Sequence, residues 1–285
     1  MNHNCKIGSI ESGPNQPLLV IAGPCVLEDQ QTNSLIGSTM RDICAELGLG
    51  FVFKASFDKA NRSSANSPRG PGLEKGLIEL ARLRDELGSP VTTDVHEPNQ
   101  AKAVAKVVDL LQIPAFLCRQ TDLLAACAKT GKPVNVKKGQ FMAASEMQHV
   151  LGKLTEAGCD QIMLTERGTF LGYHRLVNDF VGIGDLMELG PPVCFDVTHS
   201  TQLPGAGDGV SGGRPERAAL LARAAVAAGV DAVFIECHPN PDEALSDKST
   251  MQPLDKMHDL LSQLVAICSA ISPQRQHTST SSAKV

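Results

Sequence analysis

Cationic and hydroxyl side chains are concentrated after an early apolar run of the sequence. The stretch "FKASFDKANRSS", Phe53 to Ser64, holds two lysines, an arginine, an asparagine and three serines. Lysine offers a point charge and arginine a planar pair of donors, and both suit phosphate or carboxylate groups. A solvated loop is the usual interpretation of such a stretch taken alone, so its meaning depends on what gathers around it.

Other apolar runs of the chain also end in polar residues. In chain order these are Cys25, Lys54, Ser56, Asp94, Gln112, Lys137, Lys138, Glu166, Arg167, Asp196, His199, Glu236 and His238. Five cations belong to this set or its loops: Lys54, Lys59, Arg62, Lys137 and Arg167. In a chain with a net charge of -5, their convergence predicts an anionic ligand that carries phosphate and carboxylate groups.

A second set has the chemical types of metal ligands, namely Cys25, His199, Glu236 and Asp247. Thiolate, imidazole and carboxylate groups suit a divalent Fe, Mn, Co or Zn ion. Spacing alone leaves another interpretation open, because a lone cysteine is commonly a small buried apolar residue and a lone histidine a hydrogen-bonded one. Cys237 follows Glu236, and the alternation of a strand predicts that it points away from the site.

The elements that must position these residues alternate regularly. Short apolar runs such as "LLVIAG", "PVTTDV" and "AVFIECH" alternate with longer amphipathic runs such as "LEKGLIELARLRDELG", giving eight strand and helix units. This rhythm predicts a (β/α)8 TIM barrel in a single domain, in which the carboxyl ends of the strands carry the chemistry. A doubly wound open sheet is the alternative, but the sequence lacks a GxGxxG fingerprint after the first strand and a Walker A motif.

Composition limits the class of protein. The chain has 285 residues, 42% hydrophobic and 20% charged, and its negative net charge gives no overall attraction for nucleic acid or an anionic membrane. Nine cysteines without CxxC pairs, no signal peptide and no membrane-spanning run favour a cytoplasmic protein. We expect an N-terminal extension over residues 1–17 that caps the barrel, a catalytic barrel over 18–271 and a disordered polar tail over 272–285.

The blocks "IAGPC", "FKASFDKANRSS", "TDVHEP", "LQIPAFLCRQTDLL", "VNVKKGQF", "LTERGTFLGY", "FDVTHSTQLPG" and "IECHPNPDEALSDKS" occur between about residues 18 and 254. In these blocks and their order the chain resembles the 3-deoxy-D-manno-octulosonate 8-phosphate (KDO8P) synthases. The resemblance implies the condensation of phosphoenolpyruvate with D-arabinose 5-phosphate and water, with release of phosphate, in the synthesis of lipopolysaccharide precursors. The "KANRS" run resembles this family, whereas the related heptulosonate synthases, which use erythrose 4-phosphate, carry a "KPRTS"-like run.

The resemblance also implies roles for individual residues. It implies that Lys54 and Ser56 face phosphoenolpyruvate, which Lys137 and Arg167 clamp near Asp94 and Gln112. It implies that Lys59 and Asn61 lie between the substrates and that Arg62 and Ser63 hold the pentose phosphate. Arg119 is expected to reach a neighbouring subunit, usually in a tetramer. Lys59, Asn61, Lys137, His199 and Asp247 are the expected catalytic residues, and His199 also contacts substrate. Cys25 in "AGPC" resembles the metal-dependent class, whose other ligands match His199, Glu236 and Asp247.

Two further expectations concern the loops and the rival functions. The five glycines between Gly205 and Pro215 predict a mobile lid after the seventh strand. The alternatives to the synthase are a heptulosonate 7-phosphate synthase, which the "KANRS" run argues against, and a non-catalytic binding barrel, which would lack a clamp or a ligand residue.

Overall fold

The computed structural model describes residues 4–61, 68–171, 173–205 and 212–275. Its barrel strands are β3 (Leu19–Gly23), β4 (Gly50–Lys54), β5 (Val91–Asp94), β6 (Leu110–Ile113), β7 (Val134–Lys137), β8 (Ile162–Glu166), β11 (Val193–Asp196) and β14 (Ala232–His238). All eight pair in parallel in this order, and β11 pairs with β14 to close the barrel. The predicted single-domain TIM barrel is confirmed.

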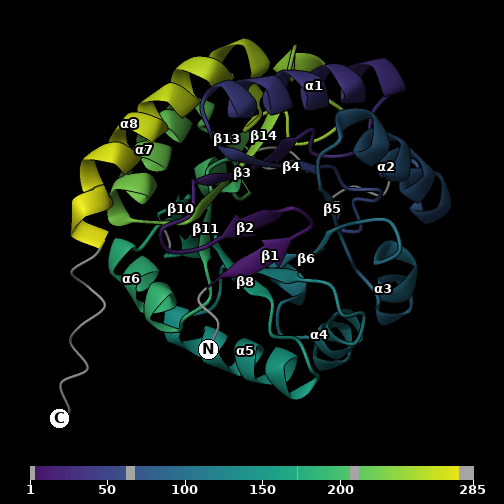
Figure 1. Cartoon of the computed structure of the whole chain (residues 1–285), viewed down its shortest axis with the longest axis horizontal. Coiled ribbons are helices and arrows are strands. Elements are labelled where there is room, and N and C mark those ends of the chain that lie inside the picture. The colour runs from purple at the N-terminus through teal and green to yellow at the C-terminus, as the bar shows by residue number, and fades with distance from the viewer. Residues whose placement is uncertain (1–3, 62–67, 172, 206–211, 276–285) are drawn as a thin grey trace.

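A helix follows each barrel strand. The helices are α1 (Gln30–Glu46), α2 (Leu73–Leu87), α3 (Pro98–Val104), α4 (Thr121–Ala128), α5 (Met147–Glu156), α6 (Phe180–Glu188), α7 (Ala218–Ala228) and α8 (Met257–Arg275). Local signals set several ends: the Asp29 carboxylate accepts a hydrogen bond from the Thr32 N–H at the start of α1, and Gly88 ends α2 with a φ of 59°. Together the helices form a ring around the strands (Figure 1).

Alternation along the strands separates two cores. Leu19 and Ile21 of β3 point into the barrel, where they pack in one cluster with Phe234 of β14, whereas Val20 belongs to the larger cluster between strands and helices. Cys237 also belongs to this outer cluster, so the prediction that it points away from the site is confirmed. Along β14, the same alternation turns Glu236 to the side of Phe234, inside the barrel.

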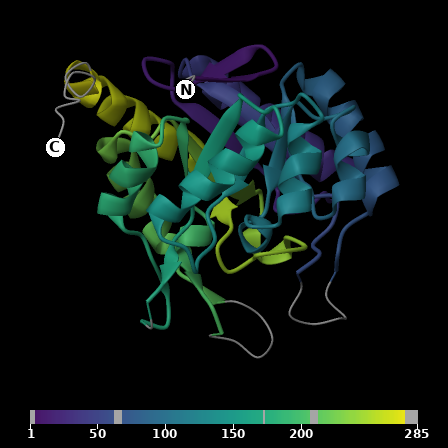
Figure 2. The ribbon, with the colours of Figure 1, turned by 90° about the horizontal axis from the view of Figure 1, so that it is seen from below.

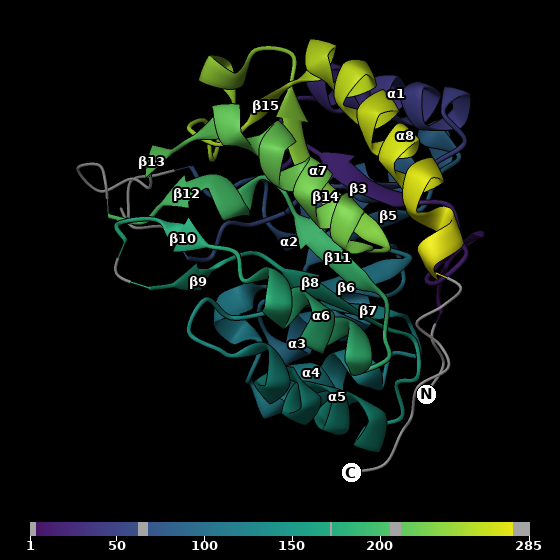
Figure 3. The ribbon, with the colours of Figure 1, turned by 90° about the vertical axis from the view of Figure 1, so that its left-hand side faces the viewer.

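Short elements cover the two ends of the barrel. The antiparallel hairpin of β1 (Cys5–Ile7) and β2 (Ile10–Ser12) lies across the amino-terminal end, where Cys5 and Ile7 are fully buried against the inner cluster. At the opposite end the pairs β9 (Thr169–Phe170) with β10 (Leu176–Val177), and β12 (Gln202–Leu203) with β13 (Gly212–Gly213), project from the barrel (Figures 2 and 3). The loop that carries Asp247 is anchored by β15 (Gln252–Pro253), which pairs with β14.

Two parts of the expected organisation fall partly on residues outside this description. Residues 206–211 of the expected lid and residues 276–285 of the expected tail lie outside the described residues, and α8 extends to Arg275. Within the described part of the chain, no helix combines the length and the apolar character that crossing a membrane requires. All nine cysteines are free thiols, and all but Cys268 are buried.

Candidate active site and metal centre

A cavity of about 670 Å³ opens at the carboxyl ends of the barrel strands, a volume typical of small-molecule sites. Its lining comes from most of the loops that follow the strands. The polar lining residues are Lys54, Lys59, Asn61, Asp94, His96, Lys137, Gln140, Arg167, His199, Gln202, Ser246, Asp247, Lys248 and Ser249. Five distant segments of the sequence therefore place charged groups around one space.

Four of the five predicted cations line this cavity: Lys54, Lys59, Lys137 and Arg167. The fifth, Arg62, lies outside the described residues, as does Ser63. Lys137 Nζ donates to Asp196 Oδ2 at 2.6 Å and lies 3.5 Å from the centre of the Phe234 ring, so this ammonium group is held in place before any ligand binds.

Arg167 is buried, and half of its guanidinium is available for a ligand. Its Nη2 donates to Gln202 Oε1 at 2.7 Å, while its buried Nη1 has no hydrogen-bond partner among the described residues. Burial lowers the pKa of Arg167, and the carboxylates of Asp196 and Asp247 oppose that effect. A buried cationic donor without a partner is costly, and an anionic ligand would satisfy it.

The predicted metal ligands meet at the base of the cavity. One ligand atom from each of Cys25, Glu236 and Asp247 lies within 4.8 Å of the others, and Cys25 Sγ donates to Asp247 Oδ2 at 2.8 Å. His199 Nε2 is 3.9 Å from Glu236 Oε2, a buried oxygen that has no hydrogen-bond partner among the described residues. The structure thus groups three of the four predicted residues, and it places His199 beside one of them, Glu236.

The register of the strands explains this convergence. Glu236 of β14 pairs with Gly23 of β3, which places the loop containing Cys25 beside it. A Cβ at Gly23 would lie 2.1 Å from the Lys54 carbonyl oxygen, so only glycine allows β3 and β4 to approach so closely here. Asp247 adopts a φ of 50°, an unfavourable conformation for a non-glycine residue that orients its carboxylate toward Cys25.

The electrostatics of this cluster suit a divalent cation. Burial, followed by the charges of Asp247 and Glu236, raises the pKa of the Cys25 thiol well above its ordinary value. Burial lowers the pKa of Lys59, but the negative groups Cys25, Glu236 and Asp247 outweigh burial and raise it. The sulfur and oxygen atoms of Cys25, Glu236 and Asp247 are donor types that hold divalent metal ions in proteins, and the His199 nitrogen lies beside Glu236.

Asp196 links the metal cluster to the cationic side of the cavity. His199 Nδ1 lies 3.0 Å from Asp196 Oδ1, and this contact favours a proton on Nδ1 and leaves the Nε2 lone pair on the side of Glu236. The other carboxylate oxygen accepts the hydrogen bond from Lys137. From the sequence, Asp196 is one of the strand-end residues without an assigned role, and this placement is the signal that points to the site.

A buried network supports Asp94. Ser56 Oγ donates a short hydrogen bond to Asp94 Oδ2, and Gln112 Nε2 donates to Asp94 Oδ1 at 2.7 Å. Ser56 and Gln112 do not line the cavity, so they support Asp94 from below. Burial opposes ionisation of Asp94, but Lys54 and Lys59 outweigh it and hold the pKa of Asp94 below its ordinary value.

Two other predicted residues lie at or beyond the rim. Asn61 is exposed and lines the cavity beside Lys59. Arg119 is exposed and does not line the cavity of its own chain. His96, within the block "TDVHEP", also lines the cavity. Its buried Nδ1 has no hydrogen-bond partner among the described residues. The sequence alone assigns no role to this histidine.

Comparison with known proteins identifies the family of the chain. Residues 2–271 match the model of the DAHP synthetase I family. The chain is 51% identical over 259 residues to a 2-dehydro-3-deoxyphosphooctonate aldolase of Desulfotalea psychrophila, covering 91% of this chain and 92% of the relative. It is 49% identical over 267 residues to the protein of the same name from Syntrophotalea carbinolica, covering 94% and 96%. The matches span nearly the whole barrel, and the chain belongs to the DAHP synthetase I family.

Proposed function

We propose that this protein is an enzyme that condenses phosphoenolpyruvate with D-arabinose 5-phosphate and water to give KDO8P and inorganic phosphate. The observation that carries the proposal is the buried Nη1 of Arg167, which lacks a partner among the described residues and lies in a cavity that also contains three lysines. Relatives about half identical over more than nine-tenths of the chain carry the name 2-dehydro-3-deoxyphosphooctonate aldolase, which supports this choice of substrates.

In this proposal, phosphoenolpyruvate occupies the side of the cavity that carries Lys137 and Arg167. Arg167 offers two donors to a carboxylate or phosphate, with Nη1 already free, and Lys137 supplies a fixed positive charge. Lys54 extends the positive surface while paired with Glu236 at 2.7 Å. Holding a trianion between these groups fixes the orientation of its C3 atom.

The pentose phosphate occupies the opposite side, toward the rim. Asn61 lines the cavity there, and the proposed phosphate ligands Arg62 and Ser63 directly follow it in the sequence. Lys59 lies between this rim and the metal cluster, and its raised pKa keeps it protonated. A proton or hydrogen bond from Lys59 would stabilise the oxygen of the pentose aldehyde as it becomes an alkoxide.

The bonds change in three steps. The C3 carbon of phosphoenolpyruvate attacks C1 of the pentose aldehyde, forming the new C–C bond and an alkoxide that takes up a proton. Water then adds to the electron-poor C2 and gives up a proton, for which Asp247, His199 and the substrate phosphate are the bases near the site. Finally, the bond between C2 and the phosphate oxygen breaks, and the ketone and inorganic phosphate form.

We further propose that the enzyme is of the metal-dependent class. Cys25, His199, Glu236 and Asp247 would hold one divalent Fe, Mn, Co or Zn ion, because they supply one sulfur, one nitrogen and two carboxylate donors near one another. When bound, such an ion supplies Lewis acidity and a fixed point for orienting an oxygen atom. Asp196 would orient His199 for this role through the Nδ1 contact.

We also propose a homotetramer in the cytoplasm, in which Arg119 enters the site of a neighbouring subunit. Exposed Phe116, Phe141, Phe170 and Tyr173 lie on loops at the carboxyl ends of β6, β7 and β8, and such an apolar surface suits contact with another copy. A cytoplasmic location fits the proposed phosphorylated substrates and the free cysteines.

Phosphate release from phosphoenolpyruvate tests the proposed reaction. We expect turnover with arabinose 5-phosphate and little with erythrose 4-phosphate, and we expect EDTA to abolish turnover and added Mn²⁺ to restore it. Preference for erythrose 4-phosphate would transfer the protein to the heptulosonate synthases. Turnover that EDTA leaves unchanged would retain the reaction and reject the metal requirement.

A further inference from the structure

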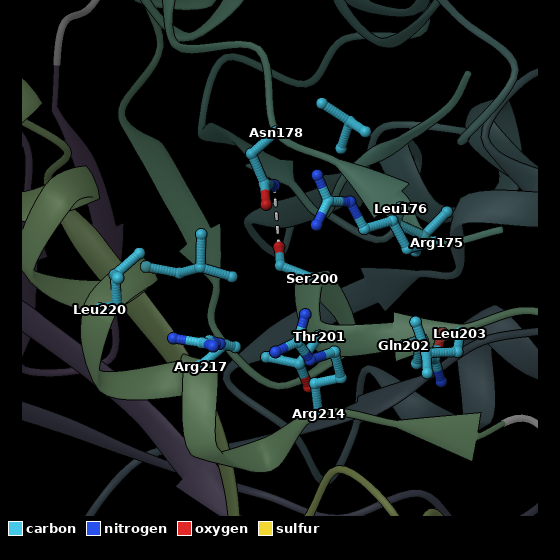
Figure 4. A pocket seen from close by; sticks show the side chains of 12 residues that line it. Arg175, Leu176, Asn178, Ser200, Thr201, Gln202, Leu203, Arg214, Arg217 and Leu220 are labelled. Carbon is cyan, nitrogen blue, oxygen red and sulfur yellow. Dashed lines mark hydrogen bonds between the residues drawn. The ribbon is translucent and has the colours of Figure 1, made fainter. Parts of the chain in front are cut away.

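A second cavity, of about 390 Å³, lies beside the β9 and β10 pair and α7, and we name it the outer cavity. It is lined by Arg175, Leu176, Val177, Asn178, Ser200, Thr201, Gln202, Leu203, Arg214, Arg217, Leu220 and Leu221. Figure 4 shows Arg175 next to β10, and it shows Arg214 and Arg217 on the short segment that leads into α7. Among the described residues, Gln202 alone lines both this cavity and the candidate active site, so the outer cavity is a separate space.

The charge of the outer cavity is positive without compensation in its lining. Arg175, Arg214 and Arg217 contribute three guanidinium groups, and among the described residues no aspartate or glutamate lines the cavity. Glu216, which does not line the cavity, contacts the Nε atoms of Arg214 at 3.0 Å and of Arg217 at 3.8 Å. The terminal Nη groups of both arginines form no hydrogen bond within the described ranges, so they remain available to a ligand.

Neutral groups in the wall complete the chemistry of an anion site. Asn178 Nδ2 donates to Ser200 Oγ at 2.9 Å, so the Ser200 hydroxyl has its own hydrogen available for donation. Ser200 is 4% exposed and belongs to the 3-10 turn His199–Thr201, and the turn is tied to Arg214 because the Arg214 N–H donates to the Thr201 carbonyl at 3.0 Å. The hydroxyl and the Arg214 backbone are therefore fixed relative to each other.

From these contacts we propose that the outer cavity binds a small dianion, namely a phosphate group that is either free or the head of a monoester. Several guanidinium donors and a hydroxyl around a compact space match the oxygens of phosphate, and arginine binds phosphate through paired N–H donors. Leu176, Leu220 and Leu221 supply an apolar surface for the carbon skeleton of a monoester. The proposal does not depend on the proposed reaction, because none of the three arginines belongs to the candidate active site.

Calorimetric titration of the full chain with inorganic phosphate, and separately with glycerol 3-phosphate, tests this proposal. The enzyme is first saturated with phosphoenolpyruvate, and the number of remaining phosphate sites per chain is compared between wild type and the double variant Arg214→Gln/Arg217→Gln. We expect the double variant to lose one site, or to bind there at least about tenfold more weakly, since each lost charged hydrogen bond weakens binding by that order.

A charge-matched control separates a local site from the loss of overall positive charge. Arg84→Gln/Arg223→Gln removes two arginines outside the cavity, which bond the Val107 carbonyl and Gln263. This control should bind phosphate as the wild type does. Binding of glycerol 3-phosphate at the lost site identifies a monoester ligand, and binding of inorganic phosphate alone identifies the free anion. Identical titrations of wild type and Arg214→Gln/Arg217→Gln would overturn the proposal.

Discussion

At the scale of single residues, the candidate site contains oppositely charged side chains in a buried space. Lys54 and Glu236 are 1% and 0% exposed and pair at 2.7 Å, yet the second oxygen of Glu236 has no hydrogen-bond partner among the described residues. A buried pair of this kind adds little net stability, because desolvation offsets the attraction. The arrangement is better explained by a bound ligand that completes it, with a cation at Glu236 and an anion at Arg167.

The proposed metal centre predicts different results for two neighbouring cysteines. Cys25→Ala should reduce bound metal from about one equivalent per chain to a small fraction and lower turnover by at least about 100-fold, because the only sulfur donor is lost. Cys237→Ala should keep the bound metal and the turnover, since Cys237 packs in the outer core. Elemental analysis of purified variants measures the metal independently of activity, and equal metal content in the two variants would contradict the assignment.

The paired donors of Arg167 predict that tight binding of phosphoenolpyruvate requires a guanidinium group at this position. Arg167→Lys keeps the charge but loses the paired donors, so we expect kcat/KM for phosphoenolpyruvate to fall about 10- to 100-fold, mainly through KM. Arg84→Lys, outside the cavity, serves as the control. An unchanged KM for phosphoenolpyruvate in Arg167→Lys would exclude the proposed clamp.

The lowered pKa of Asp94 predicts that the folded protein loses stability at acidic pH. Because its pKa in the folded protein lies below the ordinary value, its ionisation stabilises the fold above about pH 4, and this contribution is lost as the pH falls further. Thermal unfolding of wild type and Asp94→Asn should therefore show a constant gap from pH 7 to about pH 5. The gap should shrink below about pH 4, and a gap that closes already between pH 7 and pH 5 would contradict this account.

At the scale of elements, two loops that carry proposed metal ligands are tied together. Glu28 follows Cys25, and its Oε1 accepts from the Leu245 N–H at 3.0 Å while its Oε2 lies 3.2 Å from His238 Nε2. These contacts hold the loop of Asp247 against the loop of Cys25. Their loss should let the ligands separate without removing any of them.

This tie predicts weaker metal retention in a variant that keeps every ligand. Glu28→Ala should weaken metal affinity about 10- to 100-fold, the range for groups that orient metal ligands. Asp29→Ala is the matched control, because it removes the cap of α1 and costs about 1 kcal/mol of stability beside the same loop. Competition with a chelator measures the affinity, and equal metal loss in both variants would attribute the effect to general destabilisation.

The elements also show what the sequence could predict. Strand and helix rhythm predicted the barrel, and strand-end position predicted Lys54, Lys137, Arg167 and Glu236 at one mouth, because both follow from local pattern. Side-chain pairing could not be predicted, since Lys54 and Glu236 are 182 positions apart and meet only through barrel closure. For the same reason the sequence could not predict that Ser56 lies beneath Asp94 rather than in the cavity.

At the scale of the whole molecule, Arg119 does not line the candidate site of its own chain. This arginine is exposed beyond the 3-10 turn Ala115–Leu117, and its carbonyl accepts a hydrogen bond from Lys153, which fixes its backbone at the outer side of the barrel. Phe116 in the same turn is 52% exposed although it lines the cavity. An exposed arginine and an exposed aromatic residue near the mouth of the cavity are consistent with the proposed contact between copies.

Subunit mixing tests whether Arg119 acts between chains. Arg119→Ala and Cys25→Ala should each have low activity alone, and light scattering should show both as tetramers. After dissociation and random reassembly of equal amounts, a complete site needs Cys25 from one variant and a neighbouring Arg119 from the other, so about a quarter of the sites should recover. If Arg119 acted within its own chain, no complete site could form and mixing would restore nothing. The size of the recovery therefore distinguishes a site built by two subunits from a site built by one.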